Sequence, residues 1–401
     1  MTTHTAQVII VGAGPAGATA AYFLAQAGVD VLMVDKATFP RDKACGDGIG
    51  LQTGQVLEEM GLIEWLGSFN RIERALVSAP DGSAARFTRP PKVLHGYVVP
   101  RLELDAKLVE TAIGAGARLE QGVAITGLET SPTSGSARLL GKVNGKAVTL
   151  QAPLVVAADG ATASFTRRLG PVRRRVDFVA VRAYFENDGG DPGQIEIHWE
   201  KALSPGYGWI FPLGDGRANV GVGSCPRNLQ RRSIGLRAML DAFVQENAHA
   251  RARLQHARRA SPIVGHPLRT DATRMTPFID HVLVVGDAAG LTNPFTGEGL
   301  SAAMVSGQMA AAHAQRALES GDLTAHALSV YGRAFHRRFD RLHRSAYIVR
   351  AMLRFPWLIN RSIRRAEHDE AYARQIVSIF LGKGSPAELL MPGMAMRTLL
   401  G

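Results

Sequence analysis

The stretch 6–36, AQVIIVGAGPAGATAAYFLAQAGVDVLMVDK, decides the fold. It predicts a short apolar strand, a turn with three glycines, an alanine-rich helix and a second strand that ends at Asp35. In such a unit the glycines allow a tight turn, close approach of a pyrophosphate and close packing of helix on strand, while the acid accepts from a ribose hydroxyl. The stretch therefore predicts a dinucleotide site, with contacts from Gly12, Gly14, Pro15, Ala16, Gly17, Asp35 and Lys36.

A distant stretch, 281–311, identifies the dinucleotide. HVLVVGDAAGLTNPFTGEGLSAAMVSGQMAA predicts a strand, a glycine-rich loop and a helix of small residues. It resembles the second FAD fingerprint of the glutathione-reductase-like flavoproteins, in which the aspartate binds the ribityl chain and the helix points its N-terminus at the flavin pyrimidine. A positive helix end stabilises an anionic reduced flavin. The resemblance implies FAD, with contacts from Gly286, Asp287, Gly297, Gly299 and Leu300.

Two shorter segments agree with this assignment. Arg101 and Asp105 match an Arg-x-x-x-Asp pattern of these flavoproteins, in which the arginine lies near the FAD. Asp159 follows an apolar strand, as in the Asp-Gly segment of the flavin monooxygenase superfamily. The serine and arginine of that pattern follow four and seven positions after the aspartate, whereas Ser164 and Arg167 follow at five and eight, which leaves their roles open.

The stretch 205–223, PGYGWIFPLGDGRANVGVG, alternates large aromatic residues with other residues. A period of two predicts a strand with Tyr207, Trp209 and Phe211 on one face, and GDG predicts a hairpin turn to a second strand. Such a row of rings most often fills a core. Glycines along both strands favour instead a ligand that approaches the backbone closely.

The same stretch carries a more specific resemblance. Its P-x-Y-x-W-x-F-P pattern matches the motif of the geranylgeranyl reductase family, and Lys43, Cys45, Gly46 and Gly48 match the K-x-C-G-x-G pattern of that family. The resemblance implies that reduced FAD hydrogenates carbon–carbon double bonds of a hydrophobic, polyprenyl-type substrate. The substrate would contact the three aromatic residues, Pro294 and Asp47.

Two other functions remain open. Flavin-dependent halogenases and aromatic hydroxylases are the rival enzymes, and halogenases carry W-x-W-x-I-P where this chain has Tyr207 and Phe211. Asp47 stands where prenyl reductases commonly have a small residue, which would suit a more polar substrate. A flavin-bearing electron-transfer or quinone oxidoreductase subunit is the third possibility, but two cysteines cannot ligate an iron–sulfur cluster alone.

Cys45 is the candidate catalytic residue. It could donate the proton that accompanies the hydride, shape the glycine-rich turn, or simply pack as a small apolar residue. The chain has only two cysteines, which predicts no disulfide framework, no metal site and a reducing, cytoplasmic compartment. No second G-x-G-x-x-G follows a strand, so we expect NAD(P)H to bind only transiently, or a ferredoxin or flavin donor protein to supply the electrons.

The expected architecture is α/β. A discontinuous Rossmann-type FAD-binding domain would take 1–73, 101–168 and 276–330, with a mixed or antiparallel substrate sheet from 74–100 and 169–275 inserted into it. A helical region would follow over 331–401. Hairpins and strands are predicted at 75–90, 176–186 and 194–200.

The net charge of +11 raises the question of an anionic partner. Nucleic acid is not expected, because the chain lacks zinc-finger spacing, an aromatic RNA-binding signature and a lysine tail. The helical stretch 333–365 holds ten arginines and one aspartate, and Pro356 should interrupt it. It could be a helix pair with a solvated basic face, or a surface that touches a membrane through Phe355 and Trp357.

Overall fold

The computed structural model describes residues 3–88, 95–130, 135–162, 165–166, 176–380 and 384–400. A six-stranded sheet with the order β20-β21-β13-β2-β3-β9 forms the first layer. Its strands from β21 to β9 are parallel, and β20 pairs antiparallel at the edge. The bounds are β2 Val8–Val11, β3 Val31–Asp35, β9 Arg118–Gln121, β13 Leu154–Ala157, β20 Phe278–Ile279 and β21 Val282–Val284.

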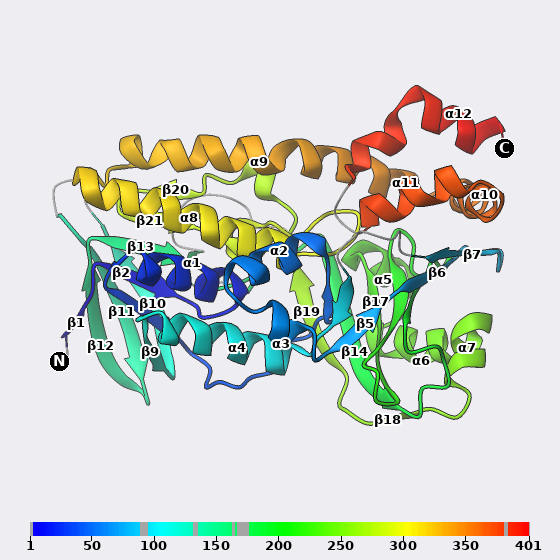
Figure 1. Cartoon of the computed structure of the whole chain (residues 1–401), viewed down its shortest axis with the longest axis horizontal. Coiled ribbons are helices and arrows are strands. Elements are labelled where there is room, and N and C mark those ends of the chain that lie inside the picture. The colour runs from blue at the N-terminus through cyan, green and yellow to red at the C-terminus, as the bar shows by residue number, and fades with distance from the viewer. Residues whose placement is uncertain are drawn as a thin grey trace.

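The central strands of this sheet are apolar along their whole length because both faces are covered. Strands β2 and β13 are buried at every position, as expected for parallel strands between two layers. One cover is helical: α1 (Pro15–Gln26) packs against both α8 (Leu300–Ser320) and α4 (Arg101–Gly114), and Figure 1 shows the three side by side. A four-stranded sheet also packs against β2 and β3. Its strands are β1 (Thr3–Thr5), β10 (Val123–Glu129), β11 (Ala137–Val143) and β12 (Lys146–Ala152).

A larger, mixed sheet forms the second part of the molecule. Its order is β18-β14-β17-β16-β15-β6-β7, and β19 pairs with β14. Helices α5 (Pro226–Arg232), α6 (Leu236–Glu246) and α7 (Ala248–Leu254) follow β17 in the chain, and α6 packs on β14 and β17. The bounds are β6 Arg74–Ser78, β7 Ala84–Thr88, β14 Phe178–Glu186, β15 Gln194–His198, β16 Tyr207–Pro212, β17 Arg217–Ser224, β18 Arg258–Arg259 and β19 Val264–Leu268.

A small connecting unit is built from the two chain segments that link the first part to the large sheet, one before β6 and one after β7. It consists of a three-stranded sheet, β4 (Gly48–Ile49), β8 (Gly96–Val98) and β5 (Asn70–Ile72), with β8 in the middle. Two helices, α2 (Leu51–Glu59) and α3 (Ile63–Leu66), join β4 to β5, and α2 packs against α8. Strand β4 directly follows residues 45–47, which are called the turn at 45–47 below.

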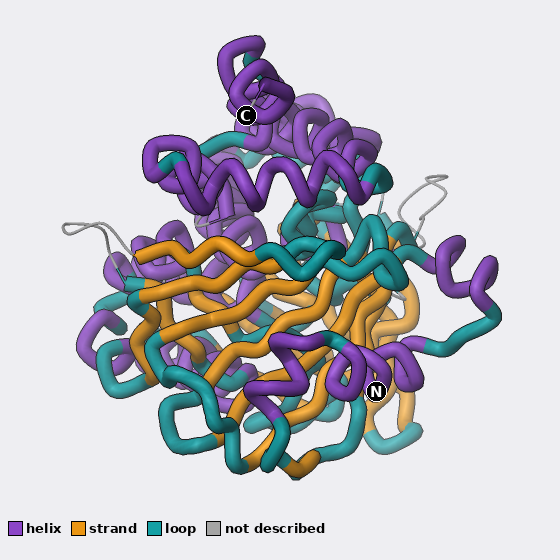
Figure 2. Tube along the Cα trace, turned by 90° about the vertical axis from the view of Figure 1, so that its right-hand side faces the viewer, coloured by secondary structure: helices purple, strands orange, loops and turns teal. Residues whose placement is uncertain are grey.

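The C-terminal part is helical. Helix α9 (Ala325–Met352) runs along α8, and α10 (Pro356–His368) begins at Pro356, where the sequence predicts the break. Helices α10 and α11 (Glu370–Phe380) pack on β7, and α12 (Pro392–Leu400) packs on α10. Figure 2 shows these helices above the large sheet. None of the helices in the described part of the chain has the length and apolar character needed to cross a membrane.

The fold class is confirmed: a Rossmann-type α/β domain, an inserted mixed sheet and a C-terminal helical segment. Both predicted hairpins are present, with β6 antiparallel to β7 and β16 antiparallel to β17. The strands of the six-stranded sheet fall in the ranges assigned to the FAD-binding domain, and those of the large sheet fall in the substrate ranges. The residue at which one domain passes into the other stays a prediction. The four-stranded sheet was not anticipated.

Candidate active site

A cavity of about 560 Å³ is lined by residues of the six-stranded sheet, the large sheet and the connecting unit, and by Ile376 of α11. This volume lies in the range typical of ligand sites. The predicted site residues that line the cavity are Gly12, Gly14, Pro15, Ala16, Asp35, Lys36, Lys43, Cys45, Gly46, Arg101, Asp159, Tyr207, Trp209, Phe211, Asp287, Gly297, Gly299 and Leu300. Segments far apart in the chain therefore meet at one site.

Four predicted site residues do not line the cavity. Gly17 and Gly286 lie behind it, where a side chain would clash with the Gly12 carbonyl oxygen and with Ala16, respectively. They act through packing rather than contact. Pro294 belongs to the loop whose later residues 296–299 face the cavity. Asp47 turns its carboxylate into the protein, away from the cavity, because that carboxylate is bonded to side chains of the large sheet.

The glycine-rich turn between β2 and α1 forms one end of the cavity. Gly12 has φ +102°, and a Cβ there would lie 2.4 Å from the Ala158 carbonyl oxygen. A Cβ at Gly17 would lie 1.9 Å from the Gly12 oxygen. Helix α1 begins at Pro15 with no acidic residue in its first turn and no side-chain cap, so no side-chain acceptor competes for its free N–H groups. This end fits an anionic group.

Asp35 is held by the turn that it follows. Its Oδ2 accepts from the Ala13 N–H at 2.8 Å, and its Oδ1 accepts from the Ala37 N–H at 2.8 Å. Each carboxylate oxygen keeps a second lone pair. Asp35 lines the cavity, and its carboxylate is still able to accept from a hydroxyl.

Two arginines of the cavity wall, Arg41 and Arg101, share the carboxylate of Asp105, which does not itself line the cavity. Asp105 is fully buried; Arg101 donates to it from Nε at 2.7 Å and from Nη2 at 2.8 Å, and Arg41 approaches it at 2.8 Å. The paired carboxylate raises the pKa of Arg101, against the effect of burial. One negative and two positive charges leave a surplus that favours an anion. Arg41 was not predicted from the sequence, where its only clue is its place two residues before Lys43.

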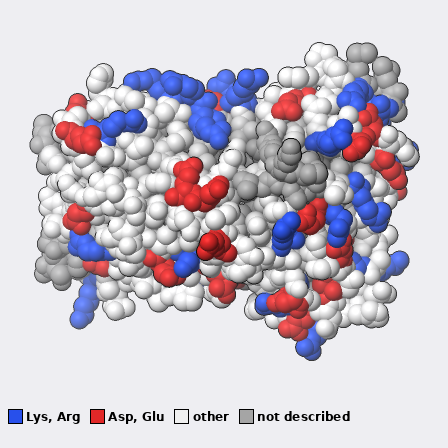
Figure 3. All heavy atoms as spheres, viewed as in Figure 1, with Lys and Arg blue, Asp and Glu red and all other residues white. Residues whose placement is uncertain are grey.

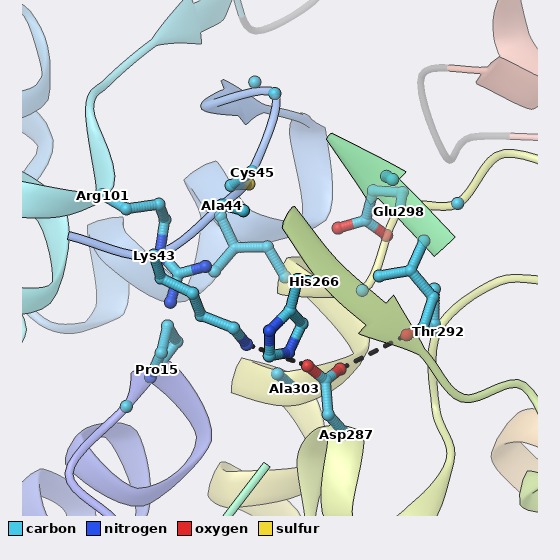
Figure 4. A pocket seen from close by; sticks show the side chains of 18 of the residues that line it. Pro15, Lys43, Ala44, Cys45, Arg101, His266, Asp287, Thr292, Glu298 and Ala303 are labelled. Atoms are coloured by element: carbon cyan, nitrogen blue, oxygen red, sulfur yellow. Dashed lines mark hydrogen bonds and ion pairs between the residues drawn. The ribbon is translucent and has the colours of Figure 1, made fainter. Parts of the chain in front are cut away.

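Lys43 and Asp287 lie 244 positions apart and form an ion pair of 3.0 Å (Figure 4). Burial alone would raise the pKa of Asp287, but the charge of Lys43 and the nearby His266 lower it to about 2. Burial and the charge of Lys43 lower the pKa of His266 to about 4. At neutral pH Asp287 is therefore a carboxylate and His266 a neutral imidazole. No sequence signal pointed to His266, which lies on β19.

The N-terminus of α8 faces the cavity together with Glu298, an acid that was not predicted from the sequence. Glu298 Oε1 accepts from the Ser301 N–H at 2.6 Å and so satisfies one of the free donors of the helix. Burial raises the pKa of Glu298, and the Asp287 charge adds to this rise. Figure 4 shows Glu298 on the same side as Thr292. In the sequence, the clue to this role was that Glu298 precedes Ser301, in the first turn of α8, by three residues.

Asp159 organises the loop after β13. Its carboxylate accepts from the Phe165 N–H at 3.0 Å and from the Thr166 hydroxyl at 2.5 Å. Burial raises its pKa despite these bonds. Ser164 and Arg167, whose roles the sequence left open, lie outside the described residues.

The other end of the cavity is apolar. Tyr207, Trp209 and Phe211 face it from β16, while Ile210 points to the opposite side and belongs to the core under α6. The polar atoms of two rings are used elsewhere: the Tyr207 hydroxyl donates to the Thr296 carbonyl oxygen, and the Trp209 N–H donates to Asn219. Aliphatic and aromatic residues continue the wall, namely Val77, Phe87, Ile195, Ile197 and Ile376.

Cys45 lies between the charged and the apolar ends. Its thiol lines the cavity beside Arg101 and the aromatic strand. Burial raises its pKa, although the Arg101 charge acts in the opposite direction. The group is therefore a neutral thiol near pH 7.

The comparisons with known proteins agree with this geometry. The FAD binding domain family matches residues 5–341. The menaquinone reductase of Mycobacterium tuberculosis is 31% identical over 364 residues, which cover 86% of this chain and 84% of the relative. Digeranylgeranylglycerophospholipid reductase 1 of Methanopyrus kandleri is 33% identical over 361 residues, which cover 86% of this chain and 90% of the relative.

The chain belongs to the FAD binding domain family. It is an FAD-dependent oxidoreductase with geranylgeranyl reductase-like relatives. A solved structure of a geranylgeranyl bacteriochlorophyll reductase-like protein from Thermoplasma acidophilum superposes with a TM-score of 0.84 at 26% identity, covering 97% of this chain and 99% of that chain. A flavin-dependent brominase superposes with a TM-score of 0.76 at 19% identity, covering 96% and 97%, which shows a shared fold.

The residues at the charged end fit the FAD of this family. The glycine turn leaves backbone room beside the α1 N-terminus, Asp35 offers an acceptor, and the two arginines around Asp105 offer surplus positive charge. Among the described residues, no cluster of three or more histidine, cysteine or acidic side chains could hold a metal ion.

Proposed function

We propose that this oxidoreductase reduces carbon–carbon double bonds of a polyprenyl or related hydrophobic substrate. One observation carries the proposal: a single cavity joins the residues suited to FAD with an apolar wall on which three aromatic rings present no free polar atom. The relatives named as reductases of a geranylgeranyl lipid and of menaquinone support a hydrophobic substrate.

FAD would be held by the residues that line the charged end. We assign the adenosine diphosphate half to Gly12, Gly14, Pro15, Ala16, Asp35 and Lys36, and the flavin half to Lys43, Gly46, Arg101, Asp287, Gly297, Gly299 and Leu300. When bound and reduced, FAD supplies a hydride to one alkene carbon. The chain contributes orientation and the exclusion of water.

The second alkene carbon needs a proton, and Cys45 is the proposed donor. Its thiol is neutral, lines the cavity and lies next to the aromatic strand. Cys45→Ser should lower turnover while FAD stays bound, because serine keeps the size of the side chain but is a far weaker acid. Anaerobic single-turnover kinetics measure the step directly. Unchanged turnover would reduce Cys45 to a packing role.

The source of electrons is a separate proposal. No second G-x-G-x-x-G follows a strand in the sequence, so we propose that NAD(P)H binds only transiently or that a ferredoxin or flavin protein delivers the electrons. Flavin bleaching under argon with each donor in turn distinguishes them.

Product mass tests the reaction. With FAD, a chemical or enzymatic reductant and a polyprenyl lipid, we expect a gain of two hydrogens per reduced bond that does not depend on oxygen. A gain of one oxygen would instead identify a hydroxylase, and incorporation of bromide or chloride a halogenase, the activity of the brominase that shares the fold. A protein that oxidises its donor only when a quinone accepts the electrons would be an electron-transfer subunit.

We also propose that the C-terminal helices approach an anionic membrane surface, where a polyprenyl lipid would be found. Arg333, Arg337, Arg338, Arg341 and Arg344 are exposed on α9, and Figure 3 shows basic side chains along that edge. Phe355 and Trp357, next to α9, are 55% and 56% exposed. Each arginine near an anionic bilayer contributes on the order of 1 kcal/mol.

Sedimentation with vesicles tests this contact. We expect binding to anionic vesicles that weakens at high salt, and weaker binding after Trp357→Ser. A protein that ignores both anionic and neutral vesicles would obtain its substrate from solution or from a carrier.

A further inference from the structure

Asn219 is a buried amide that connects two parts of the cavity wall without lining the cavity itself. It lies on β17 and is 0% exposed. Its Nδ2 donates to the Cys45 carbonyl oxygen and to Asp47 Oδ2, both at 2.7 Å, and its Oδ1 accepts from the Trp209 Nε1 at 3.0 Å. Every one of these partners belongs to the turn at 45–47 or to the aromatic strand.

The turn and the aromatic strand also touch directly. A Cβ at Gly46 would lie 3.2 Å from the Phe211 ring and 3.4 Å from the Trp209 Nε1. Gly221 stands opposite Trp209 on β17, and a Cβ there would lie 2.1 Å from the indole. Because no side chain stands at Gly221, the indole can lie across β17 and bring its N–H to Asn219. Gly46 and Gly221 thus allow the close contact between the turn and the aromatic strand, and the hydrogen bonds of Asn219 hold the two together.

Asp47 anchors the far side of the same turn. It has φ +64°, a left-handed conformation that is uncommon outside glycine, asparagine and aspartate. Its side chain is almost fully buried, and Oδ2 also accepts from the Tyr184 hydroxyl at 2.6 Å. Tyr184 in turn lies under the Arg182 guanidinium, 4.3 Å from the ring centroid. The turn is therefore tied to β14 as well as to β17.

We propose that Asn219 is a positioning residue that holds the turn at 45–47 and the Trp209 indole in one fixed arrangement, with Asp47 and Tyr184 as its second anchor. The orientation of the Cys45 thiol relative to the apolar wall then depends on an amide that touches neither substrate nor cofactor. Its effect on turnover rests on the proposed function. Its effect on the Cys45 environment does not.

The test replaces Asn219 by alanine and measures the alkylation rate of each cysteine by mass spectrometry in the FAD-loaded protein. Cys225, the other cysteine, is an internal reference because it is the N-cap residue of α5 and does not line the cavity. We expect Cys45 to react faster by about tenfold, in line with the loss of a buried hydrogen bond of about 1.4 kcal/mol, while Cys225 is unchanged. Turnover should fall by up to about 10²-fold, as for a misplaced catalytic geometry.

Asn247→Ala is the matched control. Asn247 is also a buried asparagine of the substrate part. Its side-chain amide donates a hydrogen bond to Glu200 and accepts one from the Ala250 N–H. It neither lines the cavity nor makes a hydrogen bond to the turn at 45–47. It should lower the melting temperature without changing the Cys45 rate. If both variants change the Cys45 rate equally, the effect is a general loosening and the proposal is wrong.

Tyr184→Phe covers the case in which Asn219→Ala does not fold. It removes only the hydroxyl that holds Asp47, and should raise the Cys45 rate by a smaller factor. A folded Asn219→Ala or Tyr184→Phe protein with wild-type Cys45 reactivity overturns the proposal. Because alkylation needs no substrate, a protein that shows the Cys45 effect but reduces no alkene would contradict the proposed function alone.

Discussion

Gly14 differs from the other two glycines of its motif in what surrounds it. A Cβ at Gly12 or Gly17 would meet backbone atoms, at 2.4 and 1.9 Å, whereas a Cβ at Gly14 would meet only the Arg41 guanidinium, at 3.4 Å. The protein itself therefore does not need glycine at position 14. A dinucleotide bound against the backbone there would need it, and we expect this to be the reason for the glycine.

Gly14→Val should fold and lose FAD. Its side chain would occupy the space beside the α1 N-terminus, while the flexible Arg41 can move aside. Flavin absorbance of the purified protein and its circular dichroism spectrum measure the two effects. Gly17→Val is the contrasting variant, which should lose its fold because the new side chain meets the Gly12 carbonyl. A yellow Gly14→Val protein would show that the dinucleotide does not bind here.

Asp47 makes stability depend on pH. Burial raises its pKa from an ordinary 3.8 to about 6, although the Tyr184 and Asn219 hydrogen bonds and the charges of Arg182 and Arg101 oppose this. The folded state therefore holds the proton more tightly than the unfolded state. Its stabilisation is fully present below about pH 4 and is lost as pH rises through about 6, by about 3 kcal/mol in total.

Asp47→Asn removes this titration while keeping an acceptor for both donors. The difference in unfolding free energy, wild type minus variant, should therefore fall between pH 4 and pH 7. Urea unfolding at a series of pH values measures it. Two curves that run parallel across this range would show that Asp47 ionises as freely in the folded protein as in the unfolded chain.

At the scale of elements, the packing on the two faces of the β16–β17 hairpin explains why glycine stands at positions 208 and 221. Its two faces have different neighbours: the rings face the cavity, whereas a Cβ at Gly208 would lie 2.7 Å from Phe243 of α6. Gly221 leaves room for the Trp209 indole on the cavity side. Gly208 is thus required by a helix on one face of the hairpin, and Gly221 by a ring on the other.

Gly221→Ala should displace the Trp209 ring without affecting the dinucleotide end. We expect a loss of about 1–3 kcal/mol in stability from overpacking, a clear fall in turnover, and normal FAD affinity. Gly235→Ala is the control, because a Cβ there meets nothing within 4 Å. Trp209 also has its N–H bonded to Asn219, so Cys45 reactivity should rise with the displacement. Normal turnover in Gly221→Ala would mean that the indole position is not critical.

At the scale of the whole molecule, the cavity takes its walls from three separate packing units. Its charged end lies on the core of the six-stranded sheet, its aromatic strand on the core under α6, and its far wall on the core of the C-terminal helices, which includes Ile376. FAD would contact the parts that Lys43 and Asp287 bring together. A bound dinucleotide should therefore stabilise the folded chain as a whole and not only one loop.

Removal of FAD should lower the melting temperature. A ligand present at a hundred times its dissociation constant adds about 2.7 kcal/mol to the unfolding free energy. Thermal unfolding of the stripped protein with increasing FAD should show a rising midpoint, whereas Gly14→Val should show none. A stripped protein whose midpoint ignores FAD would contradict the site.

Local patterns determined the fold class and much of the site. The turn glycines, the alternating rings and Pro356 act on their own segments through sterics, so they can be recognised without knowing what packs against them. Resemblance extended this to FAD and to a reductase. These signals located Lys43, Cys45, Arg101 and Asp287 separately, each in its own segment.

Only the tertiary structure decided how those segments meet. The parallel sheet brings the ends of distant strands together, which pairs Lys43 with Asp287 and puts Arg41 beside Asp105. His266, Glu298, Tyr184 and Asn219 gain their roles from neighbours far away in the chain, and it was these neighbours that turned Asp47 away from the cavity. The physical reason is that hydrogen bonding and burial depend on which atoms lie within a few ångströms in space, and a one-dimensional pattern carries that information only for residues that are close in sequence.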